Sequence, residues 1–573
     1  MRLHQSRRRT RIATIALAIV TMSVSVFGQS GQSTINNQQS TINLEGVIRA
    51  AAGQAAAQPQ ETTRRLSIDE AVKLGLEQNL GIQIQRLDPQ ISDIGIAQAK
   101  SFWTPQLSSN FSRQSQSQAS TNSLAGGQTV DNGTFASQVS VNQQLRWGGF
   151  YSANWNSARF TSTSLIQNFR PLLSSNIVGQ FTQPLLRNFS IDQIRQQVQN
   201  SQKLRDLSDI QLGAIITQTS RGVRNAYWDL SYAIDNLKAQ QESLKLAQQS
   251  LSDNRKRVEI GTLAPIDIVQ AQAEVASNEE RVILAEAAIK RAQDNLRTII
   301  LDPATPDFWT TAFQPTDAAP FQDMGIDMDR AVRNALDKRS DLRAAKNSLE
   351  RSDVDIRYLR NQILPDVNAQ ATYITRGIGG TQLSPVDFSA LAAGLPLSRD
   401  VVSSRGFGTV LGDVFQSAYP DWTVGVQISY PLGTNTAQTN LARAKLQYQQ
   451  AQTQLKNLEM QVAAQVREFA RQVQTNQKRV LSAKASRELQ ERKLEAEEKK
   501  LAAGMSQSFF VFQAQRDLSF ARTAEIQAIA DYNKSVVDFE TVQLVPLGGG
   551  GGGLTSAGSG SLQSGANAIV RGQ

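Results

Sequence analysis

The sequence predicts a mainly α-helical protein that also carries a membrane β-barrel, built from duplicated long helical hairpins and strand pairs. Three observations predict this fold class. Part of the chain repeats at a constant offset, two very long proline-free segments carry apolar residues at helical spacing, and several short segments alternate apolar with uncharged polar residues.

The composition excludes several kinds of chemistry. Among 573 residues there is no Cys and a single His, His4, which lies in a segment that we expect to be removed. A mature chain without His or Cys has no thiol nucleophile, no imidazole base and no nitrogen or sulfur ligand for zinc or haem. We therefore predict no enzymatic activity, no cofactor and no metal.

Residues 1–28 have the features of a secretory signal peptide. A basic region that ends at Arg11 precedes the apolar run "IATIALAIV", and a small residue, Gly28, follows. A transmembrane anchor is the alternative, but this apolar run is too short to favour it. The arginines give only weak support to a twin-arginine signal, and the absence of Cys excludes the usual bacterial lipid attachment.

The basic charge belongs largely to this signal. Removing its five arginines takes Lys plus Arg from 59 to 54 against 50 acidic residues, which leaves a net charge of +4. No large basic patch with interleaved aromatics follows, so we predict no nucleic-acid partner. No later stretch is apolar for long enough to form a transmembrane helix, so any membrane span is expected to be a β-barrel.

Composition also divides the mature chain. Residues 29–64, rich in Gln, Ser, Asn and Ala, are predicted to be a disordered leader, and 65–301 to be a first structural repeat. A linker with four prolines, 302–326, leads to a second structural repeat, 327–545. The Gly/Ser-rich tail, 546–573, is predicted to be disordered. A phosphate-binding loop is the alternative for its glycines, but no strand precedes them and no Lys-Ser/Thr follows.

The duplication begins with a helix. At the constant offset that pairs Asp69 with Asp329, "SIDEAVKLGLEQNL" aligns without gaps to "DMDRAVRNALDKRS", and the match continues to Pro105 and Pro365. Two unrelated amphipathic helices are the alternative, but a proline shared at the end of a long ungapped match favours a true repeat. Each half then reads strand segments, Pro-Leu, a very long helix, a Gly turn and another helix.

The long helices come next. Residues 434–503 contain neither Gly nor Pro, the residues that most often break a helix. Apolar residues recur there at spacings near three, four and seven, which is typical of a long packed helix. The counterpart, 192–259, is interrupted only by Gly213 and Gly222. A helix of this length extends roughly 100 Å, which suits a rod or a tube.

The strand segments lie between the paired prolines. "TFASQVSVNQQLRW" and "WTVGVQISYPL" alternate apolar with uncharged polar residues, and "YSANWNS" and "VNAQATY" do the same. The edge of a soluble β-sandwich is the alternative. Its solvent-exposed face would carry Lys and Glu, which are nearly absent from these segments, so the pattern favours a membrane barrel. The hairpin at 135–161, around "WGGF", either joins the barrel wall or caps it.

This order of elements resembles the TolC-like outer membrane efflux proteins over roughly residues 66–545. The resemblance is carried by "LSIDEAVKLGLEQN", its repeat "MDRAVRNALDKRSDL", the Pro-Leu corners and the two hairpins with Gly turns. The chain departs from the family where Leu80 follows Asn79 and Ser340 follows Arg339, at positions that are often proline. We therefore expect a softer break between the first two helices of each half.

The resemblance implies a homotrimer in the outer membrane of a Gram-negative-type bacterium, in contact with outer-membrane lipid. Four or more strands from each protomer would form a shared barrel of 12 strands or slightly more, and the helices a periplasmic tunnel. The function implied is a passive exit duct of a tripartite efflux or type I secretion system. An inner-membrane transporter would drive it through a periplasmic adaptor (membrane fusion) protein.

The resemblance also implies that the tips of the two hairpins contact the adaptor. The matching residues are Gly261, Thr262, Leu263 and Asp267 in the first tip and Gly504, Met505, Ser506 and Phe509 in the second. Asp267 has an alternative role, because a carboxylate in the first turn of a helix offsets the helix dipole.

Some family members carry acidic rings near the second tip, where this chain has Phe510 and Gln513. A cation-binding gate is therefore not expected there. An apolar constriction that also involves Phe509 and Phe512 is one interpretation, and simple packing between helices is the other.

A structural or adhesive cell-surface coiled-coil protein without a conducting pore is the alternative function. The polar face of "ASQVSVNQQLR" suits a water-filled lumen, which an adhesive rod does not need. A carboxylate-dependent hydrolase is a third class, but no acidic pair marks a cleft for it.

Overall fold

The computed structural model describes residues 62–547, apart from 121–127, 306–307, 318–320, 322–324, 388, 390–398 and 434. The predicted signal peptide, nearly all of the leader and the tail beyond 547 lie outside these residues. Within the part of the chain that is described, no helix combines the length and the apolar character needed to cross a membrane.

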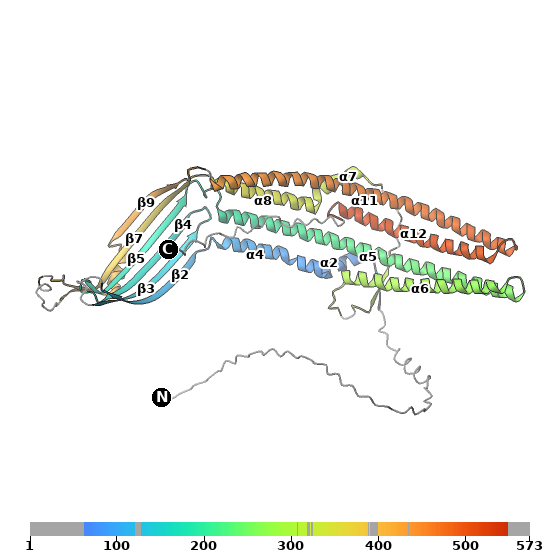
Figure 1. Cartoon of the computed structure of the whole chain (residues 1–573), viewed down its shortest axis with the longest axis horizontal. Coiled ribbons are helices and arrows are strands. Elements are labelled where there is room, and N and C mark those ends of the chain that lie inside the picture. Colours follow the sequence, from blue (N-terminus) through green and yellow to red (C-terminus); the bar gives the residue numbers. More distant parts are fainter. Residues whose placement is uncertain are drawn as a thin grey trace, which may run out of the picture. The chain divides into compact units, whose positions relative to one another are not determined.

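The described chain is mainly helical, with its long strands gathered at one end of the helices (Figure 1). The first half comprises β1 (Thr62–Leu66), α2 (Ile68–Gln78), α3 (Leu80–Gln85), α4 (Leu87–Ser101), β2 (Gln106–Ala119), β3 (Thr129–Gln144), β4 (Phe150–Ser162), β5 (Phe169–Pro184), α5 (Gln193–Glu259) and α6 (Pro265–Ile300). The second comprises β6 (Thr311–Pro315), α7 (Met328–Lys338), α8 (Ser340–Gln362), β7 (Asp366–Leu383), β8 (Val401–Arg405), α10 (Phe407–Phe415), β9 (Pro420–Ser429), α11 (Thr436–Ala502) and α12 (Ser508–Val542).

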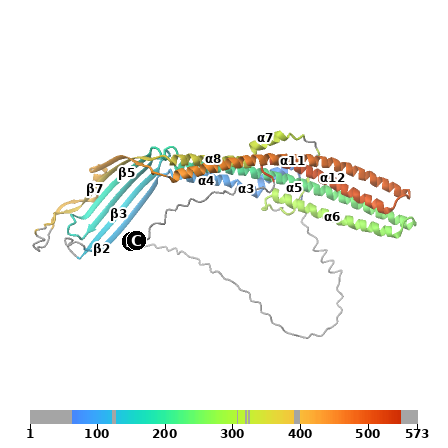
Figure 2. The same ribbon diagram turned by 45° about the horizontal axis from the view of Figure 1, so that its top comes forward.

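The main helices of the first half recur in the same order in the second, where the single helix α8 takes the place of α3 and α4. Helix α7 corresponds to α2, and both are 11 residues long. Helix α11 corresponds to α5, and both are 67 residues long, so Gly213 and Gly222 do not interrupt α5. The predicted pair of long hairpins is therefore present, formed by α5 with α6 and by α11 with α12 (Figures 1 and 2).

The expected softening of the first helical break is wrong. Asn79 has extended backbone angles, φ −64° and ψ 120°, and it separates α2 from α3 without a proline. Its Oδ1 accepts a hydrogen bond from the Ile82 amide at 3.2 Å, and its Nδ2 donates to the Ile299 carbonyl at 3.0 Å. The side chain thus caps the second helix and fixes the corner against the end of α6.

Arg339 makes the corresponding break between α7 and α8, again with extended angles, φ −64° and ψ 133°. The residue is 2% exposed, and its Nε donates to Asp341 Oδ1 at 3.0 Å. One terminal nitrogen donates to the Val542 carbonyl at 3.3 Å and the other to Gln465 Oε1. Burial lowers the pKa of Arg339, although Asp341 opposes this effect. The guanidinium therefore joins the corner to α11 and α12.

A small parallel sheet, β1 with β6, joins the two halves near the middle of the helices. The predicted leader therefore ends earlier than 64, and the predicted linker contains a strand. Tyr227 of α5 is buried beneath this sheet, and its hydroxyl donates to Asp317 Oδ2 at 2.9 Å. Burial raises the pKa of Tyr227, so the phenol stays protonated as a donor.

The large sheet is antiparallel and has the order β2-β3-β4-β5-β7, with β9 and β8 both paired to the remaining edge of β7. Strand β9 pairs with the part of β7 near the helices, Asp366–Thr375, and β8 with the distant part, Gly380–Leu383. The hairpin β3–β4 lies between β2 and β5 as part of the sheet. The hairpin, whose place the sequence left open, is therefore an internal part of the sheet.

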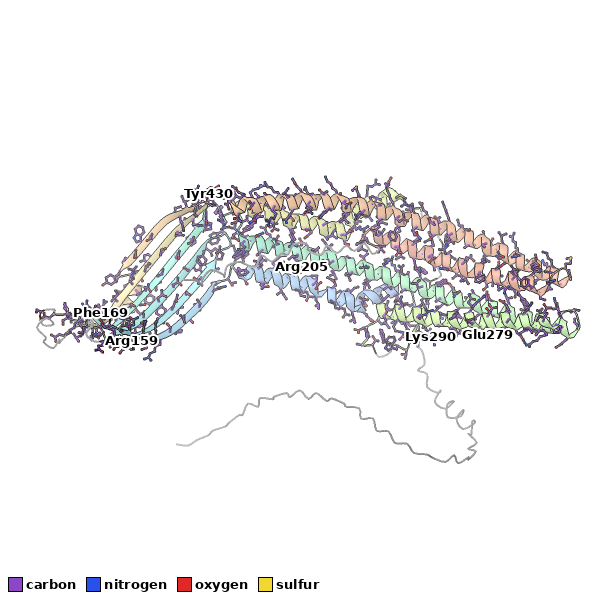
Figure 3. The ribbon with its side chains drawn as sticks, viewed as in Figure 1. Arg159, Phe169, Arg205, Glu279, Lys290 and Tyr430 are labelled. Carbon is purple, nitrogen blue, oxygen red and sulfur yellow. The ribbon has the colours of Figure 1, made fainter. Side chains whose placement is uncertain are left out.

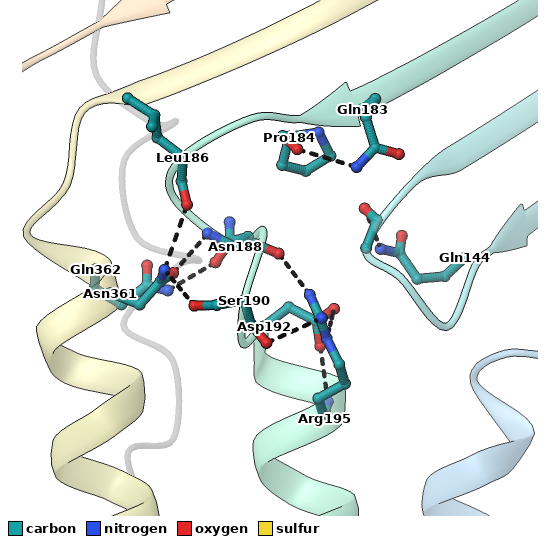
Figure 4. Close-up of polar contacts among 11 residues, drawn as sticks. Gln144, Gln183, Pro184, Leu186, Asn188, Ser190, Asp192, Arg195, Asn361 and Gln362 are labelled. Carbon is teal, nitrogen blue, oxygen red and sulfur yellow. Dashed lines mark hydrogen bonds and ion pairs between the residues drawn. The ribbon is translucent and has the colours of Figure 1, made fainter.

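A polar network fixes the corner where β5 turns into α5 (Figure 4). Asn188 has a positive φ of 64°, and its backbone amide donates to Asn361 Oδ1 at 2.6 Å. The Arg195 guanidinium spans the corner, because it donates to Asp192 Oδ2 at 2.9 Å and to the Asn188 carbonyl at 2.6 Å. Since Asn361 is in the last turn of α8, next to β7, this corner holds both repeats together where strands become helices.

Each half has its own apolar core, and each core contains a contribution from the other half. Val537 of α12 joins the core that surrounds Tyr227 and Leu296, and Ala214 of α5 packs against the core that surrounds Val466 and Tyr532. Helix α12 lies along α5 in both cores, so the repeats form one helical body.

We expect Arg339→Ala to lower the free energy of unfolding by about 3 kcal/mol, because a buried ion pair and two hydrogen bonds are removed. Urea denaturation of the protein in detergent, followed by circular dichroism, measures this loss. Arg343→Ala, at an exposed position of α8, is the matched control and should change the value by less than about 0.5 kcal/mol. Equal losses in the two variants would contradict the structural role of Arg339.

Candidate functional site

The tips of the two hairpins are built by the same backbone motif. After α5, the Thr262 amide donates to the Arg257 carbonyl at 2.8 Å and the Gly261 amide to the Val258 carbonyl at 2.9 Å. This pair of bonds is a Schellman motif, which needs a left-handed residue at the glycine position. Gly261 meets that need with a φ of +78°.

The second tip repeats the motif after α11. The Met505 amide donates to the Lys500 carbonyl at 2.8 Å, the Gly504 amide donates to the Leu501 carbonyl at 3.2 Å, and φ of Gly504 is +73°. The glycines that the sequence singled out are therefore the residues that reverse the chain. The predicted residues of the first tip lie together at the turn between α5 and α6, and those of the second tip lie together at the turn between α11 and α12.

The side chains of the second tip are the more apolar. Met505 is 75% exposed, and the exposed rings of Phe509 and Phe510 meet edge to face with centroids 5.6 Å apart. Phe512 is only 5% exposed and packs between helices, as the packing interpretation predicts. Gln513 lies exposed on the same helix. Of the four candidates for a constriction, Phe512 is thus the one that is already covered within the protomer.

Polar groups also order the tips. The Ser506 hydroxyl donates to Glu497 Oε2 at 3.0 Å, and the Lys500 ammonium lies 2.7 Å from the other carboxylate oxygen. Hydrogen bonds from Lys500 and Ser506 lower the pKa of Glu497. Asp267 lies in the first turn of α6, and its amide donates to the Ala264 carbonyl at 3.0 Å. This position fits the helix-dipole interpretation of Asp267.

Above the tips, ion pairs connect the two hairpins to each other. Arg522 of α12 donates to Glu242 of α5 at 3.2 Å and to Glu491 of α11 at 3.1 Å. Arg516 of α12 lies 3.5 Å from Glu274 of α6. Burial alone would raise the pKa of Glu491, but hydrogen bonds from Arg522 and the neighbouring arginine lower it overall. The carboxylate is therefore ionised and paired at neutral pH.

A cavity of about 360 Å³ lies between the hairpins near the tips. It is lined by α5 residues such as Asn254 and Arg257 and by Glu498, Val511 and Phe512 of the second hairpin. Burial raises the pKa of Glu498, and the nearby Glu495 carboxylate adds to the shift.

The large sheet has one polar face. The register places amide side chains level with one another across successive strands and ends at a cation, in the row Asn110, Gln138, Asn156, Asn176 and Arg376. These residues, with neighbouring serines, line a hollow of about 410 Å³ on this face. The Arg376 guanidinium donates to Asp421 Oδ2 at 3.2 Å, so its charge is paired.

The opposite face is apolar and exposed. The register places Tyr373 of β7 opposite Trp422 of β9, and Trp422 is 71% exposed. Val424, Val426 and Ile428 continue the face along β9 and are also exposed. Tyr430 lies where the strands meet the helices, and Phe169 and Arg159 lie at the far end of the sheet (Figure 3). A sheet with an apolar band on one face and amides on the other can separate lipid from water.

Four elements of this region were not identified from the sequence: β2, β5, β8 and α10. Strand β2, "QLSSNFSRQSQSQA", has Ser on both faces and Arg113 on the face of Leu107 and Phe111, so its alternation of apolar and polar residues is weak. Helix α10 rests on the apolar face of β7, so closely that a Cβ on Gly377 would overlap the Val410 carbonyl oxygen. Strand β8 precedes that helix. The glycines at 377 and 379 were the available signal, because glycine within a strand often marks a close approach of another backbone.

The sequence matches the family described as outer membrane efflux protein over residues 174–300 and 331–542. The fold is similar to the Campylobacter jejuni CmeC outer membrane channel, with a TM-score of 0.57, 14% identity, and coverage of 83% of this chain and 85% of that one. No curated protein sequence matches the chain.

Two further solved structures share the fold. The Vibrio cholerae outer membrane protein VceC has a TM-score of 0.56 and 15% identity, with coverage of 83% of this chain and 96% of that one. The open state of the Neisseria gonorrhoeae MtrE outer membrane channel has a TM-score of 0.54 and 16% identity, with coverage of 83% and 89%. At such identities the similarity establishes the fold of this chain.

We expect Gly504→Val to open the second tip, because a β-branched residue in the left-handed region costs at least about 1–2 kcal/mol. Hydrogen exchange should then accelerate at the Met505 amide, whose bond to Lys500 closes the motif. Gly504→Asn is the control, since Asn tolerates this conformation and should preserve protection. Unchanged protection in the Val variant would show that the turn does not depend on glycine.

Proposed function

The chain belongs to the outer membrane efflux protein family, and from this premise we propose that it is a passive exit duct for solutes leaving the periplasm. The observation that carries the proposal is the contrast between the two faces of the large sheet. An amide-lined face with a hollow and an exposed apolar band on the opposite face suit a wall between water and lipid.

Three copies are proposed to share one barrel. Strands β2 and β9 are each exposed along their whole length in the isolated protomer. An open sheet edge is not tolerated in lipid, because its backbone groups would lack partners. Pairing between copies removes these edges, and the resemblance to TolC-like proteins indicates that three copies close the ring.

The helices are proposed to continue the duct into the periplasm. The chain carries no chemical step of its own in this proposal. An inner-membrane transporter would supply the energy through a periplasmic adaptor that docks on the tips, in a tripartite efflux or type I secretion system. The exposed tip residues that support such docking are Thr262 and Met505, each next to the glycine that reverses the chain.

Relative movement of the two hairpins is proposed to control flux. The exposed side chains of Phe509, Phe510 and Gln513 would narrow the periplasmic mouth when three protomers bring their tips together. The pairs Arg522–Glu242 and Arg516–Glu274 would resist separation of the hairpins. The cavity of about 360 Å³ near the tips lies between the hairpins, so the two are not packed together at that point.

The cargo is proposed to cross the barrel with little discrimination by charge. The row at the centre of the polar face is made of amides, and its one cation, Arg376, is paired with Asp421. Selectivity by charge requires rings of unpaired charges, so the choice of solute would lie with the transporter.

The shape and mass of the detergent-extracted protein test the proposal. Light scattering should give three chains, and electron microscopy should show a short barrel that continues into a helical tube of roughly 100 Å with an open lumen. A single chain, or a solid rod without a lumen, would overturn the duct and leave a structural or adhesive cell-surface protein as the remaining function.

Phe510→Ala tests the constriction. In planar bilayers the variant should have a higher single-channel conductance than the wild type, because an apolar ring at the mouth resists wetting. Phe520→Ala is the matched control, since Phe520 is an exposed aromatic residue on the same helix, farther from the tip. A conductance that rises equally in both variants, or in neither, would contradict a constriction at Phe510.

A further inference from the structure

We propose that the barrel has 18 strands, six from each of three copies, and that it closes by pairing β2 of one copy with β9 and β8 of the next. This inference rests on the threefold assembly proposed above, but the strand number and the pairing come from the sheet of this chain. The sequence prediction, taken from the family, was 12 strands or slightly more.

The hairpin β3–β4 supplies the additional width. Strand β3 pairs with β2 along its whole length, from Gln106 to Ala119, and β4 pairs with β5 from Phe150 to Phe160. Both strands carry the alternation of the whole sheet: amides on the polar face, and Val139 and Trp155 on the apolar one. A hairpin that capped the mouth would not be paired along both of its edges. The β3–β4 hairpin is therefore a full part of the wall.

Strands β8 and β9 together make the sixth wall position. Both pair with the same edge of β7 and run in the same direction, and α10 connects them on the apolar face. Their combined edge has ten residues from β9 and five from β8, which is close to the 14 residues of β2. The two free edges of the protomer therefore match in length.

The edges also match in direction and in face. Strand β2 follows α4 and runs away from the helices, whereas β9 precedes α11 and runs toward them, so β2 of one copy meets β9 of the next antiparallel. Facing residues must share a side of the sheet, which limits the register to every second position. The allowed registers place Leu107 and Ser109 opposite apolar residues such as Val426 and Ile428, and keep Gln and Asn toward the lumen.

An 18-stranded wall encloses a wide lumen. Because barrel diameter grows roughly linearly with strand number, this wall would be about 1.5 times as wide as one of 12 strands. Barrels of about 16–18 strands are wide enough to leave an aqueous channel through their centre. The sheet would then pass bulkier solutes than the periplasmic mouth, and the tips would be the narrowest part of the duct.

Strand number can be counted directly in the unmodified protein. Electron microscopy of the purified assembly at a resolution that separates strands should show 18 strands around the barrel, with the β3–β4 hairpin in the wall. Three copies with 12 strands, and this hairpin outside the wall, would overturn the inference and leave the duct standing. One copy, or no closed wall, would overturn both proposals.

Disulfide formation tests the pairing, and the mature chain has no native Cys to interfere. Ser109→Cys is combined in turn with Val424→Cys, Val426→Cys and Ile428→Cys, which cover three allowed registers. Oxidation should link the copies into dimers and trimers on denaturing gels for at least one combination. Ser109→Cys with Gln427→Cys is the matched control, because these residues lie on opposite faces and should not link. Efficient linkage in the control alone, or in none of the four, would overturn the proposed pairing.

Discussion

The packing of α5 against α12 is the contact on which the rest of the structure depends. Neither long hairpin could bury its apolar residues alone, because in a pair of helices each helix is covered only on the side that faces its partner and exposes the other side to water. Val537 enters the core of the first repeat, and Ala214 covers part of the core of the second. Each fully buried aliphatic or aromatic side chain in these cores contributes about 1.5–3 kcal/mol.

Charges flank this contact along its length. Lys534 of α12 lies 2.8 Å from Asp229 of α5, and Arg221 of α5 lies 2.5 Å from Asp538 of α12. These pairs are partly exposed, so they contribute little to stability. Their value is alignment, because opposite charges in register select one longitudinal position of α12 along α5. That position sets how far each tip extends from the sheet.

The strand-to-helix corner carries the same alignment into the sheet. Since the Asn188 amide binds the Asn361 side chain, and Arg195 and Asp192 brace the same turn, the angle between β5 and α5 is fixed by hydrogen bonds rather than by packing alone. The breaks at Asn79 and Arg339 fix the chain direction farther from the sheet, at the starts of α3 and α8. Together these polar residues fix the directions of the amphipathic helices. Apolar packing by itself would leave the helices free to slide along one another.

Much of this architecture could be predicted from the sequence, and the exceptions have physical reasons. Long helices follow from the absence of proline, and the turns follow from Gly261 and Gly504, because only glycine readily adopts the left-handed backbone found there. The polar lining was visible in the alternation around Val139. The β1–β6 pairing was not, because it is parallel and joins segments that lie far apart in the chain. The role of Arg339 was not foreseen either: the break there was expected to be softer because Ser340 stands where proline is frequent, and the guanidinium depends on carbonyl and amide partners in distant helices.

The place of the β3–β4 hairpin has a consequence for how such proteins change size. A hairpin inserted between two antiparallel neighbours leaves the direction of both unchanged, and the register keeps Ser112 of β2 and Ser174 of β5 level and on the same face. Neither the helices nor their corners have to adapt. Evolution can therefore widen the sheet in steps of two strands by duplicating or acquiring a hairpin, while the helical part of the protomer keeps its dimensions.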